Sequence, residues 1–263
     1  MKKFLLTGFI LLFSYSLQSQ VLIALLLGDK LNTGNIEFGL DGGVNYSKIS
    51  KLDTNKYMNS FNLGFYFDIR MKDQWFLNTG VLVKSSLGVD KLTEADLNSL
   101  WATIHDAEGG EYKQKISYFL VPALAKYKFK NHIYAEAGPQ FGLMYKAWIE
   151  YNYDIDGNTA RIKEDNKDLI NRIEVGAAGG VGYRFLKGYG WTVGVRYHYG
   201  FTNVYKDKSG TTNSSLYLKL NIPIGVSEST KEKVQEQKEL NKAKKLKKKE
   251  ARKKNKKANN DEN

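Results

Sequence analysis

The most regular pattern in this chain is the stretch Phe61-Asn62-Leu63-Gly64-Phe65-Tyr66-Phe67-Asp68-Ile69-Arg70-Met71. Its residues alternate between two faces without a break, and successive side chains of a β-strand point to opposite faces, so the stretch predicts a strand with one apolar and one polar face. Similar alternation recurs along the sequence. The predicted strands cover residues 36–47, 61–71, 75–85, 117–129, 132–145, 172–185, 191–201 and 213–226.

The connections between these strands alternate in length. They are short at residues 72–74, 130–131 and 186–190, and longer at residues 48–60, 86–114, 146–171 and 204–212. Short periplasmic turns, long external loops and an even strand count are typical of outer-membrane barrels. The sequence therefore predicts an all-β fold, an eight-stranded antiparallel up-and-down transmembrane β-barrel at residues 36–226, located in the cell outer membrane and surrounded by its lipid.

A soluble lipocalin-like barrel is the structural alternative, because it also closes eight strands but places its apolar faces inside. Alternation alone does not separate the two. Aromatic residues at the ends of the apolar faces, together with the asymmetry of the turns, favour the membrane barrel; they are Tyr46, Trp75, Tyr127, Tyr183 and Trp191.

The N-terminus resembles a secretory signal. Lys2 and Lys3 precede an apolar run at residues 4–13 and a small, polar stretch at 16–20, which predicts a signal peptide at 1–19 with cleavage near Ser19 or Gln20. A membrane anchor is the alternative, but polar residues interrupt the run before it reaches the roughly 20 residues of a spanning helix. Residues 20–35 then form a periplasmic segment, which we expect to fold against the mouth of the barrel. The chain has no cysteine, which excludes a lipoprotein anchor and disulfides.

Charged residues occupy the polar faces of the strands. Eight strands enclose an interior that side chains can fill, so we expect a closed lumen in which acids and bases pair. A narrow path for ions or small solutes, lined by the same residues, is the alternative. The predicted lumen-lining residues are Glu37, Asp41, Asp68, Arg70, Lys84, Lys126, Glu136, Glu174, Arg184, Arg196, His198 and Lys219.

We predict no enzyme, no cofactor and no metal site. His105 and Asp106 are adjacent in a long loop, but adjacent residues rarely face one another as a catalytic pair needs. The three histidines have no metal-ligand spacing. An enzyme of the outer rim is the third hypothesis, after a structural or interaction protein and a narrow porin.

The C-terminal region, residues 227–263, differs from the barrel in composition. Lys231 to Ala258 hold fourteen Lys or Arg and four Glu, and contribute most of the formal net charge of +12. Few apolar residues are available for packing, so we expect a disordered or transiently helical periplasmic tail. An anionic periplasmic polymer, lipid head groups or an acidic protein are its expected partners, and a solubilising extension without a partner is the alternative. Export excludes nucleic acid, and we expect a monomer.

Several motifs resemble those of the small outer-membrane β-barrel domain proteins, often labelled porin-family or PorT-like. The resemblance rests on residues 38–43 (FGLDGG), 121–127 (VPALAKY), 134–142 (YAEAGPQFG) and 220–225 (LNIPIG), and covers roughly residues 28–226. It implies the barrel fold and the outer-membrane location, and a secretion-associated role like that of PorT rests on the resemblance alone. Many such barrels end on an aromatic residue, whereas this chain continues into the basic tail.

Overall fold

The computed structural model describes residues 35–105, 110–155 and 158–224, together with residues 232, 235–236 and 239–243, which are helical. The predicted signal peptide, residues 20–34, Asp106 and most of the tail lie outside the described residues. The strands are β1 (Ile36–Ile49), β2 (Lys56–Lys72), β3 (Trp75–Asp90), β4 (Glu111–Lys128), β5 (Ile133–Ile155), β6 (Asn158–Asp165), β7 (Ile173–Arg184), β8 (Thr192–Gly200) and β9 (Asn213–Pro223).

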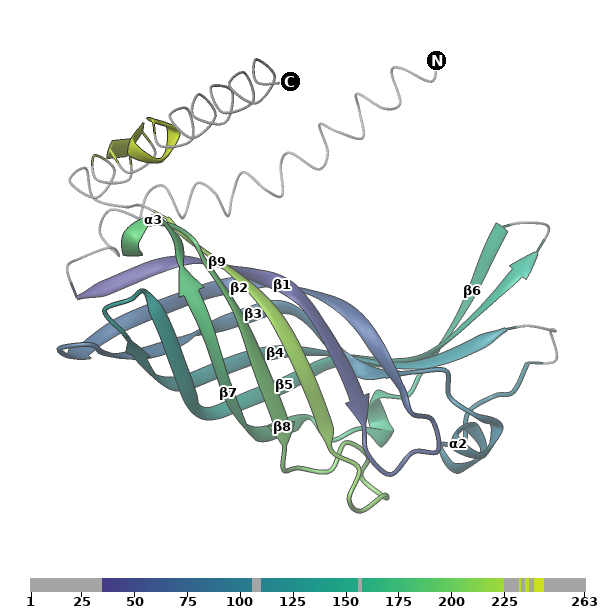
Figure 1. The fold of residues 1–263 in the computed structure, drawn as a ribbon. Coiled ribbons are helices and arrows are strands. Elements are labelled where there is room, and N and C mark those ends of the chain that lie inside the picture. The colour runs from purple at the N-terminus through teal and green to yellow at the C-terminus, as the bar shows by residue number, and fades with distance from the viewer. Residues whose placement is uncertain are drawn as a thin grey trace, which may run out of the picture.

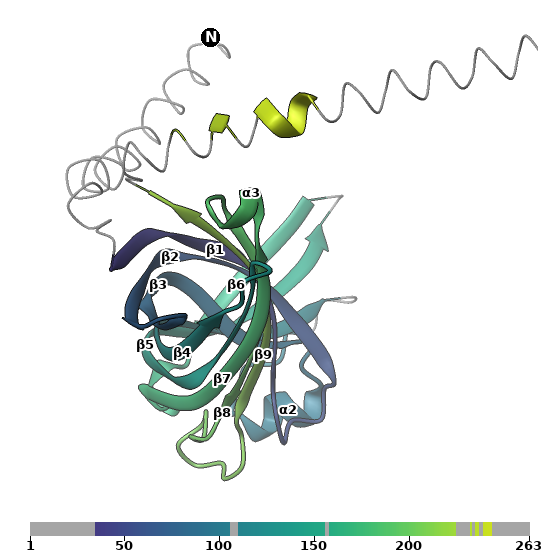
Figure 2. The same ribbon diagram turned by 60° about the vertical axis from the view of Figure 1, so that its left-hand side comes forward.

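Eight of these strands form a closed ring in which all neighbours are antiparallel (Figures 1 and 2). β1 pairs with β2 on one side and with β9 on the other, and the β4–β5 pairing completes the ring. β6 stands outside the ring, because it pairs with residues 148–155 of β5. The predicted eight-stranded all-β barrel is therefore confirmed.

The two ends of the barrel differ in their connections. The tight turns after β2 and β4, and the short helix α3 (Phe185–Gly188) after β7, lie at one end. The helix α2 (Glu94–Ser99), the β5–β6 hairpin and the 3-10 turn η1 (Lys167–Leu169) belong to the longer connections at the other end (Figure 1). We call these the inner and the outer end. No helix within the described ranges is long and apolar enough to cross a membrane.

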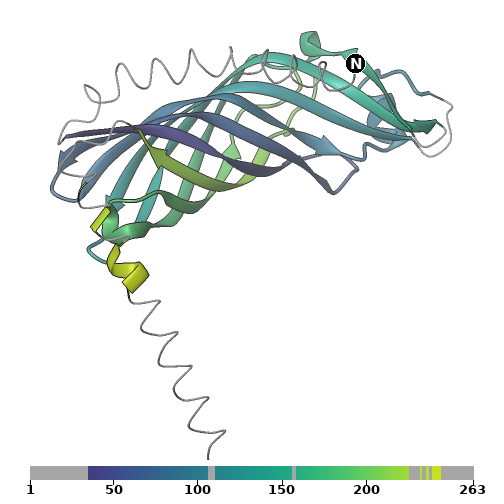
Figure 3. The same ribbon diagram turned by 90° about the horizontal axis from the view of Figure 1, so that it is seen from above.

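The strands at the outer end are longer than the sequence pattern indicated. β3 continues to Asp90, β4 already begins at Glu111, and β5 continues to Ile155 before returning as β6, so much of the predicted loops 86–114 and 146–171 is strand. Figure 3 shows these strands running on past the barrel wall. Most of their outward side chains are polar, as at Glu111, Lys113 and Lys146, which removes most of the apolar face by which the other strands are recognised. The alternation also slips by one residue at Val83 and at Tyr145.

The outer wall is apolar. Leu218 is 43% exposed and Val181 58%, and aromatic residues lie at both ends of this apolar band. At the inner end they are Trp75, Tyr183 and Trp191, with the half-buried Tyr127 against Trp75; at the outer end they are Tyr46, Phe61, Phe119, Tyr145 and Tyr199. An apolar band between two aromatic girdles is the surface of a barrel in lipid. The lipocalin-like alternative is wrong, because the polar faces point inward.

The outer half of the barrel interior contains an apolar core. Leu82, Tyr118, Leu120, Met144 and Tyr217, from β3, β4, β5 and β9, are buried there. Leu97 and Leu100 at α2, together with Val204 and Tyr205 of the β8–β9 connection, belong to the same cluster. The outer end of the lumen is thus filled by side chains that exclude water.

Polar contacts fix the outer connections above this core. The carboxylate of Asp96 in α2 accepts hydrogen bonds from the backbone N–H groups of Asp53 (2.7 Å) and Thr54 (3.1 Å) in the β1–β2 connection. Burial raises the pKa of the Tyr205 phenol above its ordinary range, and Asp96 adds to this effect. Tyr205 is therefore a neutral donor, and it donates to Oε1 of Gln114 at 3.2 Å.

Candidate functional site: the charged lumen and its inner mouth

The inner half of the barrel interior holds a network of buried charges. The carboxylate of Asp68 on β2 lies 3.0 Å from Nζ of Lys126 and 2.8 Å from Nζ of Lys128, both on β4. Asn78 on β3 donates its side-chain amide to Asp68 at 2.7 Å. Asp68 thus faces two lysines and an amide donor, contributed by the two strands that follow its own.

Glu136 on β5 is the centre of the same network. Its Oε1 lies 2.7 Å from the Arg196 guanidinium of β8 and 3.4 Å from Nζ of Lys219 on β9. Lys126 approaches its other oxygen at 3.9 Å, and Lys219 also lies 3.5 Å from Asp41 on β1. The network therefore spans the barrel from wall to wall. Each charge has a partner, which offsets the large cost of taking it out of water.

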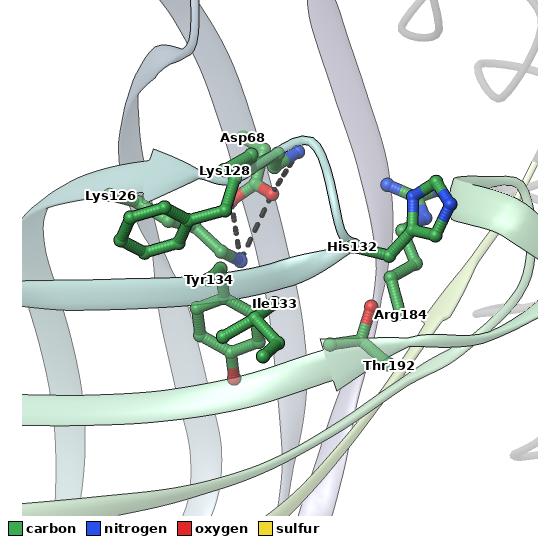
Figure 4. A pocket seen from close by; sticks show the side chains of 9 residues that line it. Asp68, Lys126, Lys128, His132, Ile133, Tyr134, Arg184 and Thr192 are labelled. Atoms are coloured by element: carbon green, nitrogen blue, oxygen red, sulfur yellow. Dashed lines mark hydrogen bonds and ion pairs between the residues drawn. The ribbon is translucent and has the colours of Figure 1, made fainter.

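The inner mouth contains a small cavity of about 90 Å³ (Figure 4). Lys126, Lys128 and Asp68 lie on one side of it and Arg184 and His132 on the other. Arg184 at the end of β7 forms an ion pair of 2.6 Å with Glu37, which also accepts a hydrogen bond from the Tyr66 hydroxyl at 2.8 Å. Phe129, Ile133, Tyr134 and Thr192 complete the lining.

A second polar pair lies apart from this network. Glu174 on β7 contacts Nε2 of His198 on β8 at 2.8 Å and accepts a hydrogen bond from the Asn213 amide at 3.1 Å. Glu174 and His198 are both buried. The pair links β7, β8 and β9 across the interior.

The twelve residues predicted to line the lumen take three positions. Eight are buried: Asp41, Asp68, Lys126, Glu136, Glu174, Arg196, His198 and Lys219. Glu37 and Arg184 are half-buried as a pair at the inner mouth. Arg70 is exposed near the end of β2, where its guanidinium lies 5.4 Å from the centre of the Phe76 ring.

The prediction that Lys84 lines the lumen is wrong, because its side chain is exposed on the outer wall. Lys84 pairs with Leu63 while Leu82 pairs with Gly64, so β3 has one extra residue, Val83, at this point. Such a bulge shifts the alternation by one position. Ser85 therefore turns inward, donating to Asn62 at 2.7 Å, and the Lys84 ammonium lies 5.8 Å from the centre of the outward Phe61 ring.

Sequence reasoning missed several inward residues of this network. Lys128 follows Lys126 by two positions and Asn78 lies on the polar face of β3, so strict alternation would have found both. The inward tyrosines Tyr66 and Tyr134 carry a different signal. They lie against glycines: a Cβ at Gly39 would be 2.5 Å from the Tyr66 ring, and one at Gly194 would collide with the Tyr134 hydroxyl. These glycines make room for large side chains in a narrow interior.

His105 lies at the outer end, among aromatic rings. Its imidazole stacks on Tyr151 with 5.1 Å between ring centres, and its backbone N–H donates to the Tyr112 hydroxyl at 2.6 Å. These contacts explain its position by packing. Among the described residues, no three His, Cys, Asp or Glu side chains are grouped so that they could hold a metal ion.

A protein-family model and two solved structures are similar to this chain. A family model described as "Outer membrane protein beta-barrel domain" matches residues 18–206. Among solved structures, the chain is similar to Ail of Yersinia pestis, whose structure was determined in complex with the heparin analogue sucrose octasulfate. The two chains are 12% identical with a TM-score of 0.40, and the match covers 72% of this chain and 99% of Ail. OprG of Pseudomonas aeruginosa is 11% identical, with a TM-score of 0.33 and coverage of 72% and 93%. No curated protein matches the chain.

Proposed function

Because the chain belongs to the family of outer membrane protein β-barrel domains, and is therefore a protein of the bacterial outer membrane, we propose that its barrel is closed and serves a structural or interaction role. The observation that carries this proposal is the filled interior. A charge-paired inner half lies below an outer half that combines an apolar cluster with the Glu174–His198 pair, and the side chains of both halves are buried.

The two halves oppose ion passage in different ways. An ion entering from the inner mouth would have to separate pairs such as Glu136 and Arg196, whose mutual attraction is strong in a water-poor interior. Beyond them it would meet Leu82, Leu120 and Met144, which offer no group to replace the water of hydration. The narrow porin remains the second candidate, and the cavity at the inner mouth is the observation that favours it.

Planar-bilayer recording tests the closed barrel. We expect no discrete conductance steps from the wild type, and steps from a Leu82→Ala/Leu120→Ala variant, which widens the apolar core. Val121→Ala on the outer wall is the matched control, because it also removes apolar atoms from β4 but leaves the lumen unchanged. Steps from the wild type would overturn the proposal in favour of the porin.

The interaction role is proposed for the outer end. Trp101, just after α2, is 87% exposed, and Ile104 nearby is 41% exposed. Large apolar side chains that are exposed on a loop are typical of protein–protein interaction sites. A photo-cross-linking amino acid at position 101 should capture a partner in cells, whereas the same group at the exposed position 130 of the inner end should not. Capture at both positions, or at neither, would count against a partner at this loop.

We also propose that the protein is not an enzyme, with His105 serving in aromatic packing. If so, His105→Ala lowers stability without removing any lipid-modifying activity from membranes that contain the protein. The outer-rim enzyme would be supported if a change in lipid composition followed expression of the wild type and disappeared in this variant.

The proposed periplasmic tail follows from where the barrel strands begin and end. Asn35 accepts a hydrogen bond from the backbone of Arg70, and Ile224 donates one to the backbone of Phe38, so both ends of the described barrel lie at the inner end. We propose that the signal peptide at 1–19 is removed and that the basic residues 231–258 contact an anionic periplasmic polymer or protein. A protease added to intact cells should leave the tail uncleaved.

A further inference from the structure

Four lysines form an outward-facing belt at the outer end of the barrel. Lys48 lies on β1, Lys84 on β3, Lys115 on β4 and Lys163 on β6. Each ammonium lies over an aromatic ring: Lys48 at 5.4 Å from the centre of Tyr57, Lys84 at 5.8 Å from Phe61, and Lys115 and Lys163 at 5.6 Å and 5.0 Å from Trp148. We call these residues the lysine belt.

The belt lacks carboxylate partners, unlike the lysines around it. Within the described part of the chain, none of its four ammonium groups lies within ion-pair distance of an Asp or Glu, whereas Lys91 pairs with Glu111 and Lys113 with Asp90. Lys115 and Lys163 even share one indole ring. Glu150 on β5 lies opposite Lys163 in the β5–β6 pairing, but its carboxylate pairs with Arg161 at 3.5 Å. An excess of positive charge along one surface attracts an external anion.

The position of the belt identifies the source of this anion. Lys84 lies beside Phe61, and Lys115 is four residues further out along β4 than Phe119, which stacks on Tyr145 in the outer aromatic girdle. At about 3.3 Å per residue, Lys115 lies about 13 Å beyond the girdle along the tilted strand. Lys163 is opposite Glu150 and hence level with Lys113, about 20 Å beyond the girdle along the strand. Aromatic girdles mark the interface between lipid tails and headgroups. The belt therefore lies at the height of the headgroups of the outer leaflet.

A hollow in the outer wall adds a second, independent observation. It measures about 390 Å³ and is lined by Lys48 and three tyrosines, with serines from β9. Tyrosine rings pack against sugar faces and lysine pairs with phosphate. The Ser215 hydroxyl is turned to the interior, where it accepts a hydrogen bond from the Asn45 amide. This lining fits a phosphorylated sugar whose acyl chains continue down the apolar wall. The lining residues are Tyr46, Lys48, Tyr57, Tyr197, Ser214, Ser215 and Leu216.

From these observations we infer that the lysine belt binds the phosphate groups of the phosphorylated glycolipid that forms the outer leaflet. The aromatic rings hold the ammonium groups in place, and the phosphates supply the missing counter-charges. The bulge at Val83 is part of this site, because it turns Lys84 from the lumen to the lipid. Bulges that redirect a side chain in this way are common near functional sites.

Lipid A binding to the full chain in detergent micelles tests the inference. The belt variant combines Lys48→Gln, Lys84→Gln, Lys115→Gln and Lys163→Gln. The control combines Lys51→Gln, Lys72→Gln, Lys130→Gln and Lys206→Gln, four exposed lysines away from the belt, and so removes the same charge. Heat-modifiable gel mobility establishes that both variants are folded.

We expect the belt variant to bind phosphorylated lipid A at least about tenfold more weakly than the wild type, since each lysine near an anionic surface contributes measurably. The control should bind like the wild type, and dephosphorylated lipid A should bind the wild type about as weakly as the belt variant binds the intact lipid. Equal loss in both variants, or no effect of removing the phosphates, would overturn the inference. Full competition by millimolar inorganic phosphate would assign the site to free phosphate instead of the lipid.

Discussion

Glu136 illustrates, at the scale of single residues, how a charge can be kept inside this barrel. It faces Arg196, Lys219 and Lys126, and removing it leaves three cations with too few anions. The pairing need not make the barrel more stable than an apolar interior would be, but losing one partner is costly because the other charges remain buried.

Glu136→Gln should therefore lower the free energy of unfolding by about 3–5 kcal/mol, measured by urea titration in lipid micelles with heat-modifiable mobility as the readout. Glu94→Gln removes the same charge from an exposed position in α2, and its effect should stay within about 0.5 kcal/mol. Equal effects of the two substitutions would show that the network is not held by charge.

The contact between Gly194 and Tyr134 gives a second prediction for single residues. Gly194→Ala places a methyl group against the Tyr134 hydroxyl and should destabilise the barrel by about 1–3 kcal/mol. Adding Tyr134→Phe removes that hydroxyl and should restore part of the loss. Gly179→Ala is the control, since its nearest neighbouring atom would lie 3.7 Å away. If the double variant is no more stable than Gly194→Ala alone, the contact is not the cause.

At the scale of elements, the β5–β6 hairpin shows what alternation alone does not reveal. The barrel strands can be recognised in the sequence because their lipid-facing side chains are apolar. This alternation of apolar and polar residues ends where the strands leave the membrane. Beyond Tyr145 the outward positions of β5 include Lys146 and Trp148, and Glu150, which is covered by its ion pair with Arg161 of β6; Ala147 and Ile149 still point into the core. The bulge at Val83 likewise cannot be recognised in the sequence, so regular alternation assigns Lys84 to the lumen when it faces outward.

This hairpin should be separable from the barrel. Replacing residues 152–161 by a two-residue turn removes pairing between β5 and β6 alone, apart from the edge contacts of β4 with Asn152. The shortened chain should still enter the membrane and show heat-modifiable mobility. A chain that no longer shifts its mobility would show that the hairpin contributes to barrel assembly.

At the scale of the whole molecule, sequence alternation was sufficient to predict the closed ring and most of its inward residues, because one face of each strand meets lipid. The apolar core at the outer end was not predicted. Leu82, Leu120 and Met144 share the inward face with polar residues, and only the closure of β4 on β5 brings them together with Tyr217.

Three of the four tryptophans can report the orientation of this molecule in the membrane. Trp75 and Trp191 lie in the inner aromatic girdle, and Trp101 stands free at the outer end. In chains that keep a single tryptophan, bromine-labelled lipid should quench the fluorescence of Trp75 strongly and that of Trp101 weakly, whereas aqueous iodide should do the reverse. Strong quenching of Trp101 by the lipid would place the outer end within the bilayer.

The pairing of β1 with β9 has a consequence for biogenesis. It joins Gly39 to Pro223, the beginning of the barrel to its end, so the ring cannot close until the last strand has been delivered. Until then β1 and β9 each present an unpaired edge, which is a template for aggregation. Long-range pairing of this kind is slow. Both edges therefore need protection during this interval, and a chain truncated before β9 would remain permanently open.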